Sequence, residues 1–203
     1  MLSQVSPLAV ALALSILSLL ASNVGAHQTM MVPKPAYVSD DKETRHNPVA
    51  FLENQNFSTQ LDFQDYMKKN KYSSLRDFMD NAKYTPAKGA DFSCGFTKSD
   101  APPEPIPKSC SVRSSGYTHD GPCALYLDDV KIYEKANCHT DIPGKEIQVD
   151  YSSCKGTCML RWYWLGIRTL KNIVSWQVYK ICVPLKRDPK DEICGAGDGT
   201  GQR

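Results

Sequence analysis

The chain has 203 residues with 24 basic and 22 acidic side chains, which gives a formal net charge of +2. That balance provides no electrostatic reason to bind nucleic acid or an anionic membrane surface. Without an N-terminal segment of 26 residues, 177 residues remain, enough for one domain with a sizeable core. We therefore expect a monomer with one domain over residues 27–194 and no nucleic-acid or membrane partner.

Residues 1–26 have the pattern of a secretory signal peptide. Residues 7–21 are almost wholly apolar, and Val24-x-Ala26 supplies the small-residue cleavage site. The segment has no Lys or Arg, so the start amine is its only positive group. The apolar stretch is shorter than the roughly 20 residues of a membrane span. We predict cleavage after Ala26, secretion to the extracellular space and a mature N-terminus at His27.

An N-terminal histidine can chelate a metal ion through two nitrogens, because it carries a free α-amine beside its imidazole. The α-amine has a reference pKa of about 7.7–8.0, so a metal can displace its proton near neutral pH. The alternative is that the cleavage site merely happens to precede a histidine. His27 alone does not decide between these interpretations.

All eight cysteines follow the predicted cleavage site. An even number in a secreted chain predicts up to four disulfides, with their connectivity left open. Cys154 and Cys158 have a spacing that a zinc site could use. No second closely spaced pair accompanies them, so disulfides are favoured over zinc. The sequence also contains a glycosylation sequon at Asn56. The cysteines are Cys94, Cys110, Cys123, Cys138, Cys154, Cys158, Cys182 and Cys194.

The first part of the mature chain is predicted to be irregular, and a helical segment follows it. Residues 27–60 are rich in Pro, Asn and Asp and show no sustained periodicity. Between 61 and 83 apolar residues recur at helical spacing, and Ser74-x-x-Asp77 can cap a second helix. The chain then returns to a loop. We predict a helical and loop insertion over about 61–109 that packs on the domain.

From Cys110 onwards, short β-like runs are separated by turns. Strands without intervening helices predict a mostly β fold, an antiparallel Ig-like or fibronectin-like β-sandwich. Three tryptophans, Trp162, Trp164 and Trp176, fall in these runs and are predicted to be core residues. The Gly-rich tail at 195–203 is predicted to be flexible. The runs are 124–127, 145–151, 158–167 and 173–185.

A second metal ligand would have to come from His46, His119 or His139. His119 lies in a turn that leads directly into a strand, a position that suits a surface metal site. We predict that His46 and His139 are ordinary solvated histidines. Gln177 and Tyr179 are two apart on a predicted strand, so both point to the same face. A tyrosine there can lie axial to a metal, although a core tyrosine is the alternative.

Together these motifs resemble the lytic polysaccharide monooxygenases, secreted copper enzymes with an Ig-like β-sandwich. The resemblance covers the N-terminal residue and roughly residues 110–185, without the predicted helices. The most similar branch is the pectin-active one of plant-pathogenic oomycetes. The motifs are His27 directly after the signal peptide, His119-x-Gly121-Pro122, Gln177-x-Tyr179-x-x-Cys182 and Cys158-Met-Leu-Arg-Trp162.

The resemblance implies a catalytic site with one copper ion. His27 would give its α-amine and a ring nitrogen, and His119 would give a ring nitrogen. Three nitrogens suit Cu(II) and tolerate Cu(I). Tyr179 would lie axial to the copper, and Gln177 would orient the oxygen species. An external electron donor and O2 or hydrogen peroxide would then drive oxidative cleavage of a polysaccharide.

Pectin, as homogalacturonan, is the substrate that the resemblance favours. Cations scattered over the loops would attract a polyanion if several of them surround the copper. A solvated surface without that role is the alternative. Other possibilities are activity on cellulose or chitin, a non-catalytic copper-binding protein, or a carbohydrate-binding effector that has lost its metal. The cations are Lys34, Lys42, Arg45, Lys98, Lys108, Arg113, Arg168, Lys171, Lys186 and Arg187.

Overall fold

A computed structural model describes most of the chain after the predicted cleavage site. The described residues are 28–53, 55, 57–170, 173–190 and 194. The predicted signal peptide, His27, Asn56, Lys171 and the tail at 195–203 lie outside them. The sequence-based expectations for these parts therefore stay predictions.

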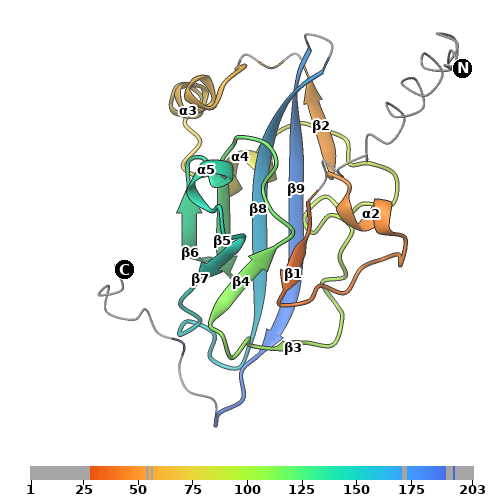
Figure 1. Ribbon diagram of the computed structural model, residues 1–203, viewed down its shortest axis with the longest axis vertical. Helices are drawn as coiled ribbons and strands as arrows, with labels where there is room; N and C mark the ends of the chain where they lie inside the picture. The colour runs from red at the N-terminus through yellow and green to blue at the C-terminus, as the bar shows by residue number, and fades with distance from the viewer. Residues whose placement is uncertain (1–27, 54, 56, 171–172, 191–193, 195–203) are drawn as a thin grey trace, which may run out of the picture.

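Two sheets form a β-sandwich, so the predicted mostly β class is confirmed (Figure 1). The smaller sheet has the order β1-β4-β7, formed by Met30–Val32, Ser111–Ser114 and Glu146–Gln148. The larger sheet has the order β2-β9-β8-β5-β6, formed by Ala50–Glu53, Ile173–Lys186, Thr157–Leu170, Cys123–Leu127 and Val130–Lys135. These neighbours pair antiparallel, and among the described strands only the two-residue β3 (Glu104–Pro105) pairs in parallel, with β9.

The β-like runs predicted after Cys110 all contribute strands, and the two longest become the centre of the large sheet. The prediction of irregular backbone over 27–60 is wrong at three short elements, which are β1, β2 and helix α2 (Lys42–His46). Elements of three to five residues are too short to produce a periodic pattern. Strand β6 was not predicted either, because most of its side chains are exposed or only partly buried.

Two of the helices lie in the predicted insertion. Helix α3 (Gln60–Lys69) begins with a capping box in which Thr59 and Asp62 bond each other's backbone. The Ser74 side chain caps α4 (Leu75–Asn81) by accepting from the Asp77 backbone N–H, as predicted. The four-residue helix α5 (Cys138–Asp141) follows β6.

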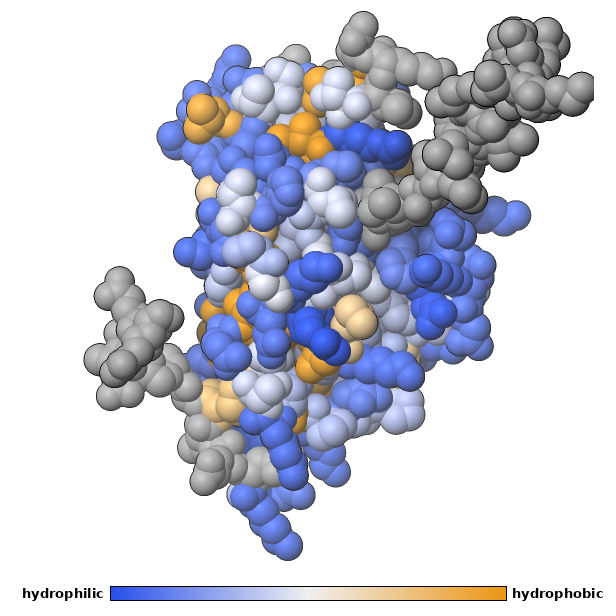
Figure 2. Space-filling view, viewed as in Figure 1, coloured by the Kyte–Doolittle hydropathy of each residue, from blue (hydrophilic) through white to orange (hydrophobic). Residues whose placement is uncertain are grey.

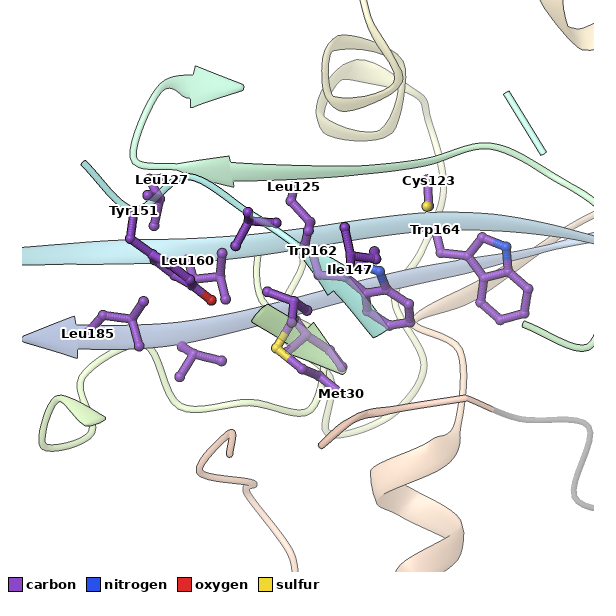
Figure 3. Packing of buried hydrophobic residues seen from close by; sticks show 14 of the residues in the cluster. Met30, Cys123, Leu125, Leu127, Ile147, Tyr151, Leu160, Trp162, Trp164 and Leu185 are labelled. Atoms are coloured by element: carbon purple, nitrogen blue, oxygen red, sulfur yellow. The ribbon is translucent and has the colours of Figure 1, made fainter. Parts of the chain in front are cut away.

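The hydrophobic core has two parts, one on each side of the large sheet. The first lies between the sheets and contains Trp162 and Trp164 (Figure 3). The second lies between the large sheet and helices α3 and α4, and contains Trp176. All three tryptophans are fully buried, as predicted. Each core residue of β9 therefore faces either the small sheet or the helices.

Four disulfides join all eight cysteines, which confirms that prediction and fixes the open connectivity. Two of them start in the segment before β4: one links it to β9, and the other links it to the chain after β9. The other two join cysteines 15 and 4 positions apart. No helix in the described ranges is long and apolar enough to cross a membrane. The pairs are Cys94–Cys182, Cys110–Cys194, Cys123–Cys138 and Cys154–Cys158.

Candidate metal centre

The loop that carries His119 is fixed against the edge of β8. The backbone N–H of Ile167 donates to the Asp120 carbonyl at 2.7 Å, and that of Leu165 to the Pro122 carbonyl at 3.0 Å. Gly121 has a φ of +144°, and a Cβ there would lie 1.9 Å from the Leu165 carbonyl oxygen. Only glycine allows this approach, so the Gly-Pro turn determines where His119 lies.

A second set of contacts holds the same loop from the α5 side. The Cys123–Cys138 disulfide links β5 to α5, and Gly121 donates to the Asn137 side chain. Asn137 Nδ2 donates to Asp120 Oδ1 at 3.0 Å, and His139 Nδ1 lies 3.0 Å from the same oxygen. The hydrogen bond from Asn137, and then that from His139, lowers the pKa of the Asp120 carboxyl.

The indole of Trp164 aligns His119 with Tyr179. The His119 ring lies nearly parallel to this indole, with 6.4 Å between ring centroids and 11° between planes. The Tyr179 ring is stacked on the indole as well, at 4.7 Å and 21°. Trp164 and Tyr179 are register partners on β8 and β9. The buried Trp164 side chain therefore contacts both His119 of the loop and Tyr179 of the sheet.

Gln177 and Tyr179 form a buried polar pair on the same face of β9. The Tyr179 hydroxyl donates to Gln177 Oε1 at 2.8 Å. Gln177 is 0% exposed, and its Nε2 has no hydrogen-bond partner among the described residues. Burial raises the pKa of Tyr179, whereas a hydrogen bond from the Gln28 backbone and the charge of Arg168 oppose that rise. The Gln177 amide thus has a buried N–H donor that is available to an acceptor at this site.

Gln28 connects the start of the described chain to both parts of the site. Its side chain is buried, donates to Thr118 Oγ1 at 3.0 Å and accepts from Ser115 Oγ at 2.8 Å. Its backbone N–H bonds the Tyr179 hydroxyl. The residue after His27 therefore contacts both the residue before His119 and the predicted axial tyrosine.

Among the predicted site residues, His119 and Tyr179 both stack on Trp164, and Gln177 bonds Tyr179, while their role at a metal stays a prediction. His27 lies outside the described residues, so its contacts stay a prediction. His46 instead bonds within α2, where its Nδ1 lies at hydrogen-bond distance from the Lys42 carbonyl. His139 is half exposed and pairs with Asp120, which the prediction of an ordinary solvated histidine did not include. Within the described residues no three His, Cys, Asp or Glu side chains form a metal-binding group.

Two residues that organise the site, Gln28 and Trp164, were not predicted as site residues. Gln28 could have been considered because it adjoins the predicted N-terminal ligand. Trp164 was predicted only as a core residue, because its stacking with His119 depends on how the loop meets β8. Nitrogen ligands with a tyrosine nearby are compatible with copper, and Gln177 Nε2 has no hydrogen-bond partner among the described residues.

An open hollow of about 390 Å³ borders the His119 loop. Eight of its nine lining residues have hydroxyl, amide, imidazole or carboxylate side chains, and Ile167 adds an apolar wall. The space-filling view shows a mostly hydrophilic surface with small hydrophobic patches (Figure 2). The lining residues are Ser58, Thr59, Gln60, Thr118, His119, Asp120, His139, Ile167 and Thr169.

The fold and this site define a disulfide-bonded β-sandwich protein with a candidate metal centre near the middle of its two longest strands. Comparison with known proteins adds no family to that description. No protein-family model matches the chain, and no curated protein sequence matches it either.

Proposed function

We propose that the protein is a secreted, copper-dependent polysaccharide monooxygenase that cleaves pectin oxidatively. The observation that carries the proposal is the pair of bonds from Gln28, one to Thr118 and one to Tyr179. Because Gln28 follows His27 directly and Thr118 precedes His119, these bonds favour a site shared by the two histidines. The sequence resemblance to the lytic polysaccharide monooxygenases supports the same conclusion.

In this proposal His27 would hold the copper through its α-amine and ring, and His119 would hold it through its ring. A bound copper ion would supply redox chemistry for O2 or hydrogen peroxide, with electrons from an external donor. Tyr179 keeps its proton at neutral pH, because burial raises the pKa of its hydroxyl. That hydroxyl can therefore donate to Gln177 Oε1, which fixes the amide so that Nε2 faces the centre.

Secretion is part of the proposal, because only cleavage after Ala26 frees the α-amine of His27. Four disulfides are compatible with an extracellular location, where such bonds persist. The open surface beside His119 is compatible with a polymeric substrate, which cannot enter an enclosed pocket. Pectin is proposed from the resemblance to the pectin-active branch.

The decisive experiment compares His119→Ala with His139→Ala in protein that begins at His27. We expect His119→Ala to lose the Cu(II) electron paramagnetic resonance spectrum and the release of oxidised oligosaccharides from homogalacturonan. His139→Ala should keep the copper spectrum. Protein with one extra N-terminal residue should bind copper several kcal/mol more weakly, since the α-amine leaves the chelate.

Two results would contradict the proposal in different ways. Equal copper binding by the extended protein would exclude the proposed chelate. Tight copper binding without oxidised products from pectin, cellulose or chitin would instead indicate a non-catalytic copper-binding protein. Mass spectrometry of products from a panel of cell-wall polymers distinguishes these cases.

A further inference from the structure

The hairpin of β8 and β9 continues beyond the candidate metal centre with side chains on the same face. Cross-strand partners in an antiparallel pair point to the same side of the sheet. Trp164 is paired with Tyr179, and the next partners on that face are Gly166 with Gln177 and Arg168 with Ser175. Arg168 is therefore the first cation on this face beyond the Gln177 and Tyr179 pair.

Strand β2 widens this face by one strand. Phe51 is in register with Gln177, and Glu53 with Ser175. Ala50 and Leu52 are buried in the core against the helices, so the alternate residues Phe51 and Glu53 point to the metal-centre side. Phe51 is 51% exposed, which is unusual for a large aromatic side chain on a sheet.

The positive charge of Arg168 is available on this face. Its side chain is partly buried, and its charge acts on the Tyr179 hydroxyl. Within the part of the chain that the structure describes, no ion pair involves Arg168. Gly166 lies between Arg168 and Trp164 on this face and has no side chain. A Cβ there would lie 2.9 Å from the Trp164 indole, so the position has no room for one.

We infer that Arg168 selects the substrate by binding a carboxylate of a polyuronate chain, while Phe51 packs against a neighbouring sugar ring. This inference rests on the proposed function and names the residues that would give it its substrate class. A guanidinium binds a carboxylate through two parallel hydrogen bonds, which an ammonium or a hydroxyl does not match. The strands of Phe51 and Arg168 are two sheet spacings apart, about 10 Å, so one extended chain can contact both.

Glu53 provides an internal contrast, because it brings a negative charge to the same face. It is exposed and lies one cross-strand step from Ser175, with Arg168 on the other side of that serine. A carboxylate there repels a polyanion and competes for the guanidinium. Removing the two charges should therefore change the affinity for a polyuronate in opposite directions.

The test measures binding of homogalacturonan by calorimetry, with metal-free protein that begins at His27, so that it does not depend on activity. Arg168→Gln should weaken binding of the de-esterified polymer by about tenfold or more, the usual effect of losing one charge-assisted hydrogen bond. Glu53→Gln should strengthen it. The fully methyl-esterified polymer should bind Arg168→Gln and the unchanged protein equally.

Arg187→Gln is the matched control, because it removes the same charge just beyond the opposite end of β9. It lies twelve positions from Ser175 along the chain, about 40 Å if extended, and should leave binding unchanged. Equal weakening by Arg187→Gln, or no weakening by Arg168→Gln, would overturn the inference. If the protein without substitutions shows no Cu(II) spectrum when copper is added, only the proposed function is overturned. The binding comparison is unaffected, because it uses metal-free protein.

Discussion

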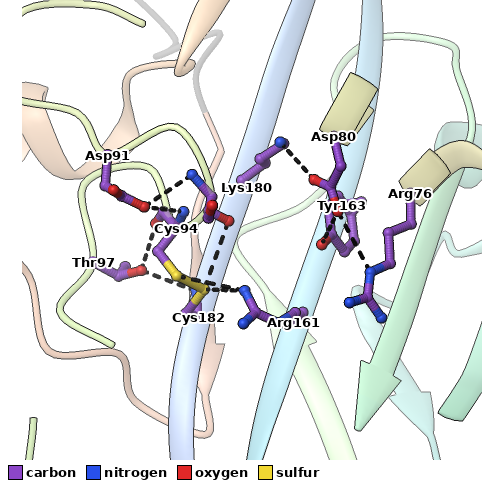
Figure 4. Close-up of a disulfide and its surroundings, with 10 residues drawn as sticks. Arg76, Asp80, Asp91, Cys94, Thr97, Arg161, Tyr163, Lys180 and Cys182 are labelled. Carbon is purple, nitrogen blue, oxygen red and sulfur yellow. Dashed lines mark hydrogen bonds and ion pairs between the residues drawn. A yellow bond between two sulfur atoms is a disulfide. The ribbon is translucent and has the colours of Figure 1, made fainter. Parts of the chain in front are cut away.

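Tyr179 and Lys180 are consecutive residues of β9, and the polar groups around them differ in how completely they are satisfied. Lys180 faces the helices, where its Nζ donates to Asp80 Oδ1 at 2.7 Å and lies 4.3 Å from the Phe92 ring centroid (Figure 4). Asp80 also accepts from the Tyr163 hydroxyl and pairs with Arg76. This buried charge is therefore balanced and hydrogen-bonded within the fold.

On the opposite face, the Tyr179 hydroxyl is satisfied but the Gln177 amide is not. Its Nε2 is buried and lacks a hydrogen-bond partner among the described residues. An unsatisfied buried donor costs about 1–3 kcal/mol, so a fold does not gain stability from it. The polar groups on the Lys180 side are therefore satisfied within the fold, whereas the Gln177 side keeps a buried donor that folding does not use.

The largest effect on the free energy of unfolding should follow from Asp80→Ala, which removes the ion pair with Lys180. The substitution leaves Lys180 buried without its counter-ion, and we expect a loss of roughly 3 kcal/mol in the free energy of unfolding. Urea denaturation measures it. The double variant Asp80→Ala/Lys180→Met should recover most of that loss, because no unpaired charge remains. If Asp80→Ala weakened copper binding and left the free energy of unfolding unchanged, the Lys180 side would not have a stabilising role.

A smaller effect per residue and pH unit should appear at alkaline pH, through the tyrosines of the core between the sheets. Burial raises the pKa of Tyr117, Tyr151 and Tyr179 above the ordinary value of 10.0. Their contribution to stability is complete below pH 10.0, and it is lost as the pH rises from there through the folded-state pKa. Each tyrosine should cost up to about 1.4 kcal/mol per pH unit in that range.

Denaturation in urea on both sides of pH 10.0, with tyrosinate absorbance as a second signal, measures this dependence. Tyr179→Phe should reduce the slope by the share of one tyrosine. An unchanged slope would show that Tyr179 titrates in the folded protein as it does in the unfolded one.

The smallest effect on stability should come from the double variant Gln177→Met/Tyr179→Phe. Replacing both partners of a buried hydrogen bond by apolar groups of similar shape is close to neutral, and the unused Gln177 donor disappears with them. We expect a change of less than about 1 kcal/mol. The Cu(II) spectrum should nevertheless change, which separates function from folding at this position. A loss as large as that of Asp80→Ala would contradict the comparison.

The sequence predicted the parts of the fold that have long local patterns. Strands β8 and β9 have many alternating apolar residues, and the Ser74 cap of α4 has a motif of its own. The disulfide pairs could not be predicted, because Cys94 and Cys182 are 88 residues apart and meet only through the sheet. Strand β1 has three residues, and they form a strand because β4 pairs with them.

The candidate site shows the same division between local and long-range information. His119, Gln177 and Tyr179 were predicted from short motifs, and the structure shows that His119 and Tyr179 stack on Trp164 and that Gln177 bonds Tyr179. The contacts of Gln28 with Thr118 and of His119 with Trp164 span 90 and 45 positions of the chain. Such contacts depend on the register of β8 and on the Gly121 turn, so residue types and spacing do not reveal them.

Two of the disulfides have a topological consequence. Cys94–Cys182 and Cys110–Cys194 join the same two segments at both ends, so residues 94–110 and 182–194 form one covalent ring. A single peptide-bond cut inside this ring separates no fragment from the molecule. The protein can thus be nicked there and remain one covalent unit, with its fragments released only after reduction.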